Sequence, residues 1–548
     1  MPAYEYPLLL KQLLLTPLAQ NTPHEIVYGK SRRYNYPTLR ERIGRLGSAL
    51  SRLGVKAGDT VAMMDWDSHR YLECYFAVPM LGAVLQTVNV RLSTEQVVYC
   101  LNHAEASLLI CNLDFLPMFE AMRHDLKTIE KIVWISDAGP IPEGPPGQGE
   151  YEDFIAWGDP GHVFADFDEN TRATLFYTTG TTGLPKGVTF THRQLVLHTL
   201  AALVTLPLSR ESVYMPITPM FHVHAWGIPY AATLAGCKQV YPGRYLPEVL
   251  LGLIRDERVN FTHCVPTILQ MILAAPSSKD VDLTGLHMII GGSALPRALC
   301  EAALERGIDV FSGYGMSETC PLLAIATAEP QPMPDKERDI KTRMKAGRPF
   351  PLVDLRIVDF DMNDVAHDGI ASGEVVARAP WLTQVYYKNP AATGVLWEGG
   401  YLHTQDVGTI DSDGYLQITD RIKDVIKTGG EWVSSLEVES IIGQHPAVAE
   451  VAVIGLPDPK WGERPAAAVV PRVGAALEAA DIRDQVMRQA ELGVVSRYAV
   501  PERVFFVEEL PKTSVGKLDK KALRASLAAA ITEAPAAPSP SAMTTLTT

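Results

Sequence analysis

Apolar and polar positions follow helix-like and strand-like periods in turn, up to about residue 320. Residues 38–56 carry apolar side chains three or four positions apart, which predicts an amphipathic helix that stops at Gly54. This repeat is formed by Leu39, Ile43, Leu46, Leu50 and Leu53. Apolar runs then predict strands at Thr60–Met64 and Val84–Val88, with a helix near Tyr71–Leu81 between them. Alternation of this kind indicates layered α/β structure.

Two later regions have different patterns. Residues 353–420 contain short strands and Gly-containing turns, which predicts a β-rich subdomain. The chain past Asp420 is long enough for a small α+β domain. Its predicted elements are a helix from Ser434, strands at Ala447–Ile454, Ala466–Pro471 and Val504–Val507, and a helical stretch over 480–492. The final residues are rich in Ala, Pro, Ser and Thr and have no usable apolar pattern.

We therefore expect an α/β protein in three parts. Residues 1–422 form a large N-terminal domain, with two α/β layered subdomains and the β-rich subdomain. Residues 423–529 form a small α+β C-terminal domain, and residues 530–548 form a disordered tail. The length of 548 residues agrees with more than one domain, because single cores stop growing at about 250–300 residues.

Composition and charge exclude some partners. Hydrophobic residues make up 47% of the chain and charged residues 20%, which is ordinary for a globular protein. The formal net charge of −14 argues against nucleic acid or an anionic membrane as the main partner. It does not exclude small anionic cofactors, because a local basic loop can still bind them.

The cysteines and the N-terminus indicate the compartment. The seven Cys residues are dispersed and form no Cys-x-x-Cys pair, which suits buried free thiols in a reducing environment. The chain begins without a basic segment followed by an apolar one, so we expect no signal peptide. No run of about 18 apolar residues predicts a transmembrane segment. These features together predict a cytoplasmic protein.

Residues 177–187 carry the clearest chemical signal. They read Tyr-Thr-Thr-Gly-Thr-Thr-Gly-Leu-Pro-Lys-Gly and follow the apolar run Ala173–Tyr177, which predicts a strand feeding a loop. Gly permits inward-facing backbone N–H groups, Thr adds hydroxyl donors, and Lys186 adds a point charge suited to phosphate. A plain surface turn remains the alternative interpretation.

This loop does not fit the common nucleotide-binding pattern G-x-x-x-x-G-K-[ST]. Counting from Gly180, the second Gly is replaced by Pro185; counting from Gly183, it is replaced by Val188. A GTPase or a motor-type ATPase is therefore disfavoured.

Three further motifs stand beside the loop. They are Gly313-Tyr-Gly-Met-Ser-Glu-Thr319, Asp406 followed by Asp420-Arg421-Ile-Lys-Asp424, and Pro511-Lys-Thr-Ser-Val-Gly-Lys517. Together they resemble the adenylate-forming superfamily of acyl-CoA synthetases, luciferases and peptide-synthetase adenylation domains, over nearly the whole chain. The stretches Met220–Trp226 and Lys427–Ser435 are most similar to those of bacterial medium- and long-chain fatty acyl-CoA synthetases (AMP-forming).

The resemblance implies a two-step reaction with ATP, Mg²⁺ and coenzyme A. A carboxylate attacks the α-phosphate of ATP to give an acyl-adenylate and pyrophosphate, and the thiol of CoA then displaces AMP. It implies catalytic roles for Lys517, His222 and Glu318, with Thr178 and Glu318 attending the metal. A solvated turn for Lys517 and a helix cap for Glu318 are the alternatives.

The resemblance also assigns the nucleotide site. Tyr314 would stack on adenine, Asp406 would accept the ribose hydroxyls, and Arg421 would bind ribose or phosphate oxygens. The full expected set is Thr178, Thr179, Gly180, Thr181, Thr182, Gly183, Lys186, Gly292, Ser312, Gly313, Tyr314, Gly315, Ser317, Asp406, Arg421, Lys423 and Lys427. One position departs from the family: Gln405 stands where a Gly usually precedes the Asp, and it would strain the turn if that turn needs a positive φ.

The resemblance also assigns residues to the path of the acyl group and of CoA. His222 and Trp226 stand four positions apart and could share a helical face; the resemblance places the His by the acyl-phosphate and the Trp as a gate of the acyl tunnel. Gly291 would line the acyl-adenylate. Gly430 and Trp432 would face the path of the CoA thiol. Packing in the core is the alternative for both Trp residues and for the His.

Rotation of the C-terminal domain would serve the two half-reactions in turn. One orientation would present Lys517 and the other the Gly430 loop, with a hinge at Lys423. The acid itself stays open between a medium- or long-chain fatty acid, a short acid such as 3-methylthiopropionate, and an aryl acid. A luciferase-like or carrier-protein adenylating enzyme and a non-catalytic nucleotide-binding regulator are further alternatives. Relatives of the long-chain type suggest a homodimer through the N-terminal domain.

Overall fold

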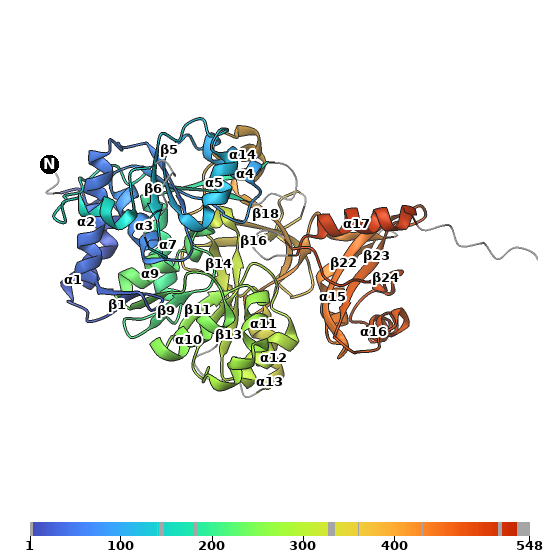
Figure 1. Ribbon diagram of the computed structural model, residues 1–548. Coiled ribbons are helices and arrows are strands. Elements are labelled where there is room, and N and C mark those ends of the chain that lie inside the picture. The colour runs from blue at the N-terminus through green and yellow to red at the C-terminus, as the bar shows by residue number, and fades with distance from the viewer. Residues whose placement is uncertain are drawn as a thin grey trace, which may run out of the picture. The chain divides into compact units, whose positions relative to one another are not determined.

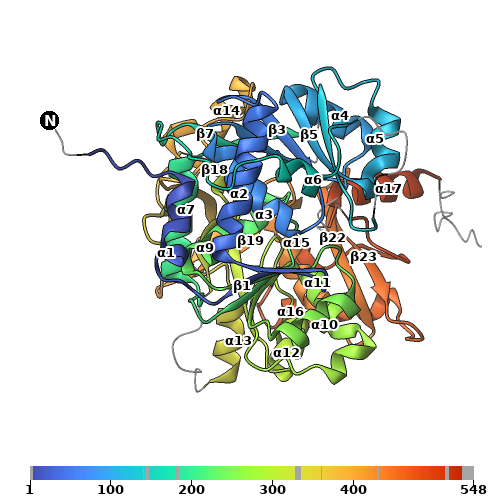
Figure 2. The same cartoon turned by 60° about the vertical axis from the view of Figure 1, so that its left-hand side comes forward.

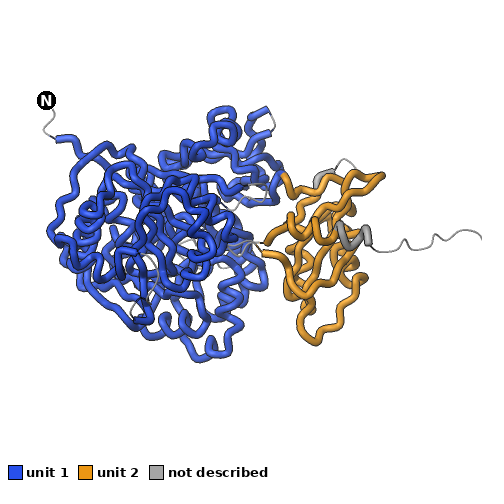
Figure 3. The backbone as a smooth tube through the Cα atoms, turned by 45° about the horizontal axis from the view of Figure 1, so that its top comes forward, with its two compact units in different colours: residues 1–422, 514–517 blue, residues 423–513, 518–548 orange. Residues whose placement is uncertain are grey.

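The computed structural model describes residues 4–139, 141, 147–178, 184–326, 335–359, 361–428, 431–512 and 518–533. The chain divides into two compact units that meet in sequence between Ile422 and Lys423 (Figure 3). Among the described residues, no helix has both the length and the apolar character that a membrane span requires. All seven cysteines are buried free thiols, as the sequence predicts.

A six-stranded sheet forms the first layer of the large unit. Five strands run parallel and the sixth closes an antiparallel hairpin. In spatial order they are β6 (Lys131–Ile135), β5 (Ala106–Asn112), β3 (Thr60–Met64), β4 (Val84–Thr87), β7 (Arg172–Thr178) and β8 (Lys186–Thr191). Every residue of β3 and β4 is buried, which explains why these strands read as continuous apolar runs.

A nine-stranded sheet forms the second layer. Its spatial order is β15 (Arg348–Pro349), β14 (Leu322–Ile325), β13 (Asp309–Gly315), β12 (His287–Ile290), β11 (Phe261–Cys264), β9 (Val213–Pro216), β10 (Lys238–Tyr241), β1 (Glu25–Tyr28) and β2 (Arg32–Asn35). The six central strands, β13 to β1, are parallel. On β12, Met288 and Ile290 enter one hydrophobic cluster and Ile289 enters another, so both faces of this sheet are covered.

Helices cover the two sheets (Figures 1 and 2). The helix predicted over 38–56 spans Tyr36–Arg52 (α2), and the side chain of Asn35 caps its first turn. Four residues of its predicted apolar repeat, Leu39, Ile43, Leu46 and Leu50, are buried, and Leu53 follows the helix. Helices α10 to α13 gather along the nine-stranded sheet in both views. The remaining bounds are α1 (Leu15–Ala19), α3 (His69–Met80), α4 (Thr94–His103), α5 (Leu116–Met122), α6 (Tyr151–Ala156), α7 (His192–Thr205), α8 (Val223–Trp226), α9 (Ile228–Ala235), α10 (Pro247–Glu257), α11 (Pro266–Ala274), α12 (Arg297–Glu305), α13 (Lys336–Met344) and α14 (Pro390–Leu396).

The predicted β-rich region is a four-stranded antiparallel sheet in the same unit. It consists of β16 (Asp354–Val358), β17 (Gly373–Arg378), β18 (Leu402–Ile410) and β19 (Leu416–Arg421), paired in that order. Buried and more exposed positions are mixed along these strands, as expected of a sheet with one covered face.

The second unit is a small α+β body with its own core. Its strands are β20 (Ile426–Thr428), β21 (Glu431–Val433), β22 (Val448–Asp458), β23 (Gly462–Pro471) and β24 (Arg503–Phe506). Its helices are α15 (Ser435–Gly443), α16 (Ala479–Glu491) and α17 (Lys520–Glu533). The strands and helices predicted from the sequence are present, with boundaries shifted by a few residues.

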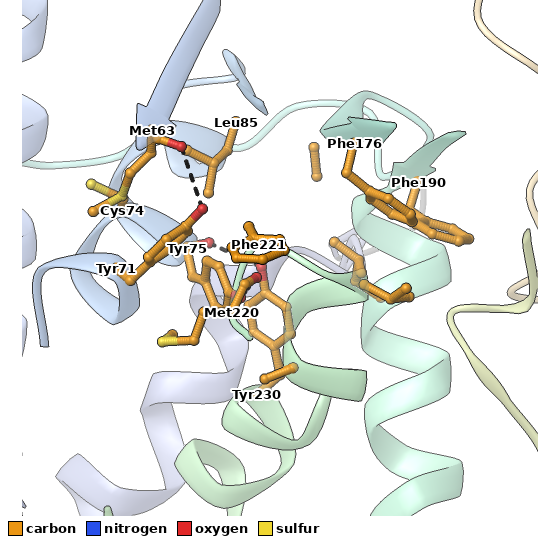
Figure 4. Packing of buried hydrophobic residues seen from close by; sticks show 14 of the residues in the cluster. Met63, Tyr71, Cys74, Tyr75, Leu85, Phe176, Phe190, Met220, Phe221 and Tyr230 are labelled. Atoms are coloured by element: carbon orange, nitrogen blue, oxygen red, sulfur yellow. Dashed lines mark hydrogen bonds between the residues drawn. The ribbon is translucent and has the colours of Figure 1, made fainter. Parts of the chain in front are cut away.

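One aromatic cluster joins the two sheets of the large unit (Figure 4). Tyr75 on α3 stacks on Tyr230 of α9 with ring centroids 5.3 Å apart, and Tyr71 packs edge-on against Tyr75 at 5.5 Å. The Tyr75 hydroxyl donates to the backbone oxygen of Met220, just after β9. The core thereby fixes the start of the segment that carries His222 and Trp226.

Candidate active site

The predicted phosphate loop connects two paired strands. Thr178 at the end of β7 pairs with Lys186 at the start of β8. The loop therefore leaves and re-enters the sheet at the same place. Residues 179–183, which carry most of the predicted phosphate donors, lie outside the described residues.

Tyr386, which the sequence analysis did not identify, contacts both Lys186 and Glu318. The Tyr386 hydroxyl donates to Oε1 of Glu318 at 2.6 Å, and the Lys186 ammonium lies 4.8 Å from the centre of the Tyr386 ring. Burial raises the pKa of Glu318 above its ordinary value, while the Tyr386 hydrogen bond and the nearby charges of Lys186 and Arg421 lower it. The carboxyl group thus lies in a buried site that feels the charges of two cations.

Backbone hydrogen bonds bring Tyr386 to this position. The N–H of Tyr387 donates to the carbonyl of Gly187 on β8 at 2.8 Å. The N–H of Thr383 donates to the carbonyl of Glu318 at 2.9 Å. The segment 383–387 therefore links the strand after the phosphate loop to the segment that carries Glu318.

Tyr314, Asp406 and Arg421 form a second group of contacts. The Tyr314 hydroxyl donates to Oδ2 of Asp406 at 2.8 Å, and Nε of Arg421 lies 3.1 Å from Oδ1 of the same carboxylate. Burial raises the pKa of Tyr314 well above its ordinary value, so this residue remains a neutral donor. Tyr314 stands inside β13, which continues to Gly315.

Small residues keep the backbone of β13 close to its neighbours. A Cβ on Gly315 would lie 1.7 Å from the carbonyl oxygen of Pro321, and one on Gly313 would lie 3.0 Å from Ile289. Within the described part of the chain, the buried Oγ of Ser312 has no hydrogen-bond partner. A buried hydroxyl without a partner is costly, and a bound ligand would satisfy it. Ser317 is partly buried beside Glu318 in a short 3-10 helix.

Gln405, which stands where the resembling family usually has Gly, has a positive φ. Its φ is 59°, in the left-handed region, at an irregularity in the pairing of β17 and β18. The Gln405 N–H donates to Oε1 of Glu374 at 3.0 Å, and its carbonyl accepts from Ile422 at 3.0 Å. These bonds hold the residue in a conformation suited to Gly.

His222 and Trp226 line one small cavity of about 40 Å³, but they do not share a right-handed helix. Val223, His224, Ala225 and Trp226 all have positive φ, between 47° and 60°, so the turn is left-handed and the predicted helical spacing is wrong here. The cavity is mostly apolar. Its lining includes Ile217, Pro219, Val265 and Ile268, together with Arg91, Tyr245 and Gly292.

Trp226 fits a slot formed by Gly291 and His263. A Cβ on Gly291 would lie 2.9 Å from Cη2 of Trp226, and the rings of Trp226 and His263 are 4.9 Å apart. His263 is hydrogen-bonded to the Tyr214 hydroxyl at 2.8 Å and to the Thr218 hydroxyl at 3.0 Å. Burial lowers the pKa of His263 to about 3, so its ring is neutral.

Family models match most of the chain. The model described as AMP-binding enzyme matches residues 16–387, and the AMP-binding enzyme C-terminal domain matches residues 437–517. The chain belongs to the AMP-binding enzyme family.

Curated relatives of this family member include three acid–CoA ligases. A long-chain-fatty-acid–CoA ligase of Thermus thermophilus is 41% identical over 90% of this chain and 90% of the relative. A 3-methylmercaptopropionyl-CoA ligase of Ruegeria pomeroyi is 40% identical, covering 89% and 91%, and a medium-chain-fatty-acid–CoA ligase of Ectopseudomonas oleovorans is 36% identical, covering 90% and 91%. Among solved structures, the anthranilate CoA ligase AuaEII in complex with anthranoyl-AMP has a TM-score of 0.83 at 27% identity, covering 97% and 99%.

These relationships make the protein an adenylate-forming enzyme close to the fatty acyl-CoA synthetases, and an AMP-forming acid–thiol ligase. Mg²⁺ fits the residues at hand. Glu318 and Thr178 offer oxygen donors, and Mg²⁺ is commonly held by one or two carboxylates with substrate phosphates and waters. Among the described residues, no group of three or more His, Cys, Asp or Glu is placed to hold a metal ion.

The predicted residues of this ligase do not all lie in one described place. In the large unit, Lys186 pairs with Thr178 and meets Glu318 at Tyr386, and Asp406 contacts Tyr314 and Arg421. His222, Trp226 and Gly292 line the cavity. Gly291 lies against Trp226 and the backbone of Gly313, which follows Ser312 in β13. Lys423 and Lys427 belong to the second unit. Gly430 and Lys517 lie outside the described residues, and only the backbone of Trp432 is described, in β21 opposite Lys427.

Proposed function

We propose that this ligase activates a medium- or long-chain fatty acid and transfers it to coenzyme A. The main support is the relative named for long-chain fatty acids, at 41% identity, with the medium-chain relative at 36%. The mostly apolar lining of the cavity beside Trp226 also suits an alkyl chain.

In the first step, the acid's carboxylate attacks the α-phosphorus of ATP and pyrophosphate leaves. Fixed positive charge in a water-poor site lowers such a barrier by a few kcal/mol. We assign this role to Lys517, with His222 beside the acyl-phosphate and Lys186 on the leaving phosphates. Glu318 and Thr178 would hold Mg²⁺, which when bound neutralises part of the triphosphate charge.

The remaining residues would hold the nucleotide. Tyr314 would stack on adenine, and Asp406 with Arg421 would bind the ribose. The backbone and hydroxyls of Thr178, Thr179, Gly180, Thr181, Thr182 and Gly183 would donate to phosphate oxygens. The buried hydroxyl of Ser312, which has no hydrogen-bond partner among the described residues, supports a ligand beside β13.

In the second step, the CoA thiol attacks the acyl carbon and AMP leaves. We propose that residues 423–529 rotate about Lys423, so that Lys517 is replaced by the loop with Gly430 and Trp432. The division of the chain between Ile422 and Lys423 supports this position for the hinge.

A shorter acid is the second candidate. Two relatives named as 3-methylmercaptopropionyl-CoA ligases are 40% and 38% identical to this chain. A cavity of about 40 Å³ is far smaller than a long acyl chain, so binding of a long chain requires lining side chains such as Trp226 to move. A short acid requires less movement of Trp226.

A screen of acids tests both candidates. Purified enzyme is given ATP, Mg²⁺ and CoA with 3-methylthiopropionate, cinnamate, octanoate or hexadecanoate, and AMP is measured with and without CoA. We expect the highest kcat/KM with octanoate or hexadecanoate. A maximum with 3-methylthiopropionate or cinnamate would contradict the fatty-acid assignment, and no CoA-dependent AMP with any acid would contradict the ligase itself.

We also propose a homodimer through the large unit. Exposed apolar side chains on α1 and α7, Leu15, Leu200 and Val204, support an apolar contact surface there. Light scattering should give twice the chain mass of 60.0 kDa. A single-chain mass at micromolar concentration would remove this proposal.

A further inference from the structure

A buried carboxylate links the two sheets at the acid cavity. Asp67 lies between β3 and α3, in the layer of the six-stranded sheet, and is 4% exposed. Its Oδ1 accepts from the backbone N–H of Met220 at 2.9 Å, and its Oδ2 accepts from the Tyr245 hydroxyl. Its own carbonyl accepts from the N–H of Gly243 at 2.9 Å. All three partners belong to segments that follow strands β9 and β10 of the other sheet.

These contacts reach two walls of the cavity. Met220 stands two residues before His222, and Tyr245 is itself a lining residue. The same segment is held by the Thr87 hydroxyl, which donates to the carbonyl of Phe221 at 2.8 Å, and by the Tyr75 hydroxyl on Met220 (Figure 4). Asp67 is the charged member of this set, so a change in its ionisation changes the support of both walls.

The surroundings of Asp67 leave its charge finely balanced. The pKa of Asp67 is raised to about 7, because burial and the charge of Asp65 outweigh the hydrogen bonds from Tyr245 and Met220 and the charge of Arg91, which lower it. The Arg91 guanidinium lies 6.0 Å from the Tyr245 ring and 6.0 Å from the Phe221 ring. The other neighbours stay neutral, because burial raises the pKa values of Tyr71, Tyr75, Tyr214 and Tyr241 well above their ordinary value.

We propose that Asp67 is a positioning residue of the acid pocket, which holds the His222 segment and Tyr245 in place while it is ionised and releases them when it is protonated. The reason is the number of hydrogen bonds that the Asp67 side chain can accept in each protonation state. The ionised carboxylate accepts from two donors, Met220 N–H and Tyr245 O–H, whereas the protonated acid carries a hydrogen on one oxygen. One buried donor then loses its acceptor, or Tyr245 turns away.

The sign of the pH dependence follows. The pocket is ordered above the pKa of Asp67 and loosens as the pH falls through it, so the KM for the acid rises towards low pH. For a group that titrates at about 7, the protonated fraction rises roughly tenfold between pH 8 and pH 6, and the KM for the acid should rise by up to the same factor. The acid substrate keeps its own charge over this range. The inference rests on the proposed acid–CoA ligase function.

Three variants test the proposal, using the best acid of the screen above. Asp67→Asn should give a KM for the acid about tenfold higher than wild type at pH 8, independent of pH from 6 to 8, with kcat within about twofold. Tyr245→Phe removes a hydrogen bond that lowers the Asp67 pKa, so its rise in KM should move to higher pH. Asp65→Asn removes a neighbouring charge that raises it, so the rise should move to lower pH.

The outcomes separate this proposal from its rivals. A pH-dependent KM that persists unchanged in Asp67→Asn would overturn it and assign the titration to another group. If Asp67→Asn does not fold, an unshifted profile in Tyr245→Phe overturns it equally. Failure of the proposed function is distinct, because wild-type enzyme would then make no acyl-CoA, and the KM for ATP serves as an internal control.

Discussion

Tyr386 contacts both side chains that we assign to the phosphate end of the site. Its hydroxyl holds Glu318 and its ring face carries Lys186. We predict that Tyr386→Phe lowers kcat/KM for ATP about tenfold and raises the Mg²⁺ concentration for half-maximal activity. A tenfold loss equals about 1.4 kcal/mol, close to the contribution of a hydrogen bond to a charged group.

Tyr387 offers a matched control for this variant. Its ring faces Arg172 at 4.7 Å and Lys388 at 5.0 Å. Tyr387→Phe should leave both the ATP and the Mg²⁺ dependence within about twofold of wild type. Equal effects of the two variants would show that the Tyr386 hydroxyl does not position Glu318.

The left-handed φ of Gln405 leads to a prediction about the stability of the fold. A left-handed φ costs a non-Gly residue about 1–2 kcal/mol, and the greater entropy of an unfolded Gly offsets about 0.5–1 kcal/mol of the relief. Gln405→Gly should therefore raise the thermal unfolding midpoint slightly, because both backbone hydrogen bonds are kept. Gln417→Gly, on the neighbouring strand without a positive φ, should lower it. A lower midpoint for Gln405→Gly would mean that its side chain stabilises the fold.

Sequence reasoning found site residues that stand in local motifs and missed those defined by distant contacts. Glu318 and Tyr314 share one short motif, and Asp406 stands in the segment before another. Tyr386 reaches Glu318 across 68 positions, and Asp67 reaches Tyr245 across 178. Nothing near Tyr386 or Asp67 in the chain signals these partners, because the sheets bring them together.

The left-handed turn at Val223–Trp226 is the element least accessible from the sequence. Four L-residues in a left-handed conformation are individually unfavourable, and apart from the following Gly227 no local signal predicts them. The strands, by contrast, were visible as apolar runs, since both of their faces are buried. The structure therefore keeps a costly turn where His222 and Trp226 line the cavity, a pattern common at functional sites.

The close contact between Gly291 and Trp226 leads to a prediction for this turn. A side chain at position 291 would meet the Trp226 ring, because a Cβ there would lie only 2.9 Å from Cη2. Gly291→Ala should raise the KM for the acid several-fold by pushing Trp226 into the cavity. Trp226→Ala in the same chain should restore part of that loss, since it removes the clashing ring. Additive losses in the double variant would show that the two residues act independently.

At the scale of the whole molecule, the two half-reactions depend on different parts of the chain. If Lys517 acts only in adenylation, Lys517→Ala should slow acyl-adenylate formation about a hundredfold or more. Thioester formation from supplied acyl-adenylate should stay near normal. Lys512→Ala is a matched control, because Lys512 pairs with Glu450 at 3.0 Å within the second unit. Equal losses in both half-reactions would remove Lys517 from this role.

The sequence predicts more of the overall architecture than of the site. Apolar periods indicated the layered α/β unit, the β-rich sheet and the small α+β unit. They carried no information on the cavity, whose walls come from segments after β4, β9, β10, β11 and β12. The chain length of the acid depends on those walls, so the motifs define the reaction better than the substrate.

The central claim is that the acid attacks the α-phosphate of ATP and that its oxygen leaves with AMP. The most direct test uses the best acid of the screen, labelled with ¹⁸O in both carboxylate oxygens, with ATP, Mg²⁺ and CoA. Mass spectrometry of the products should find one ¹⁸O atom in AMP and none in pyrophosphate. Label in inorganic phosphate, with ADP as the nucleotide product, would contradict the account.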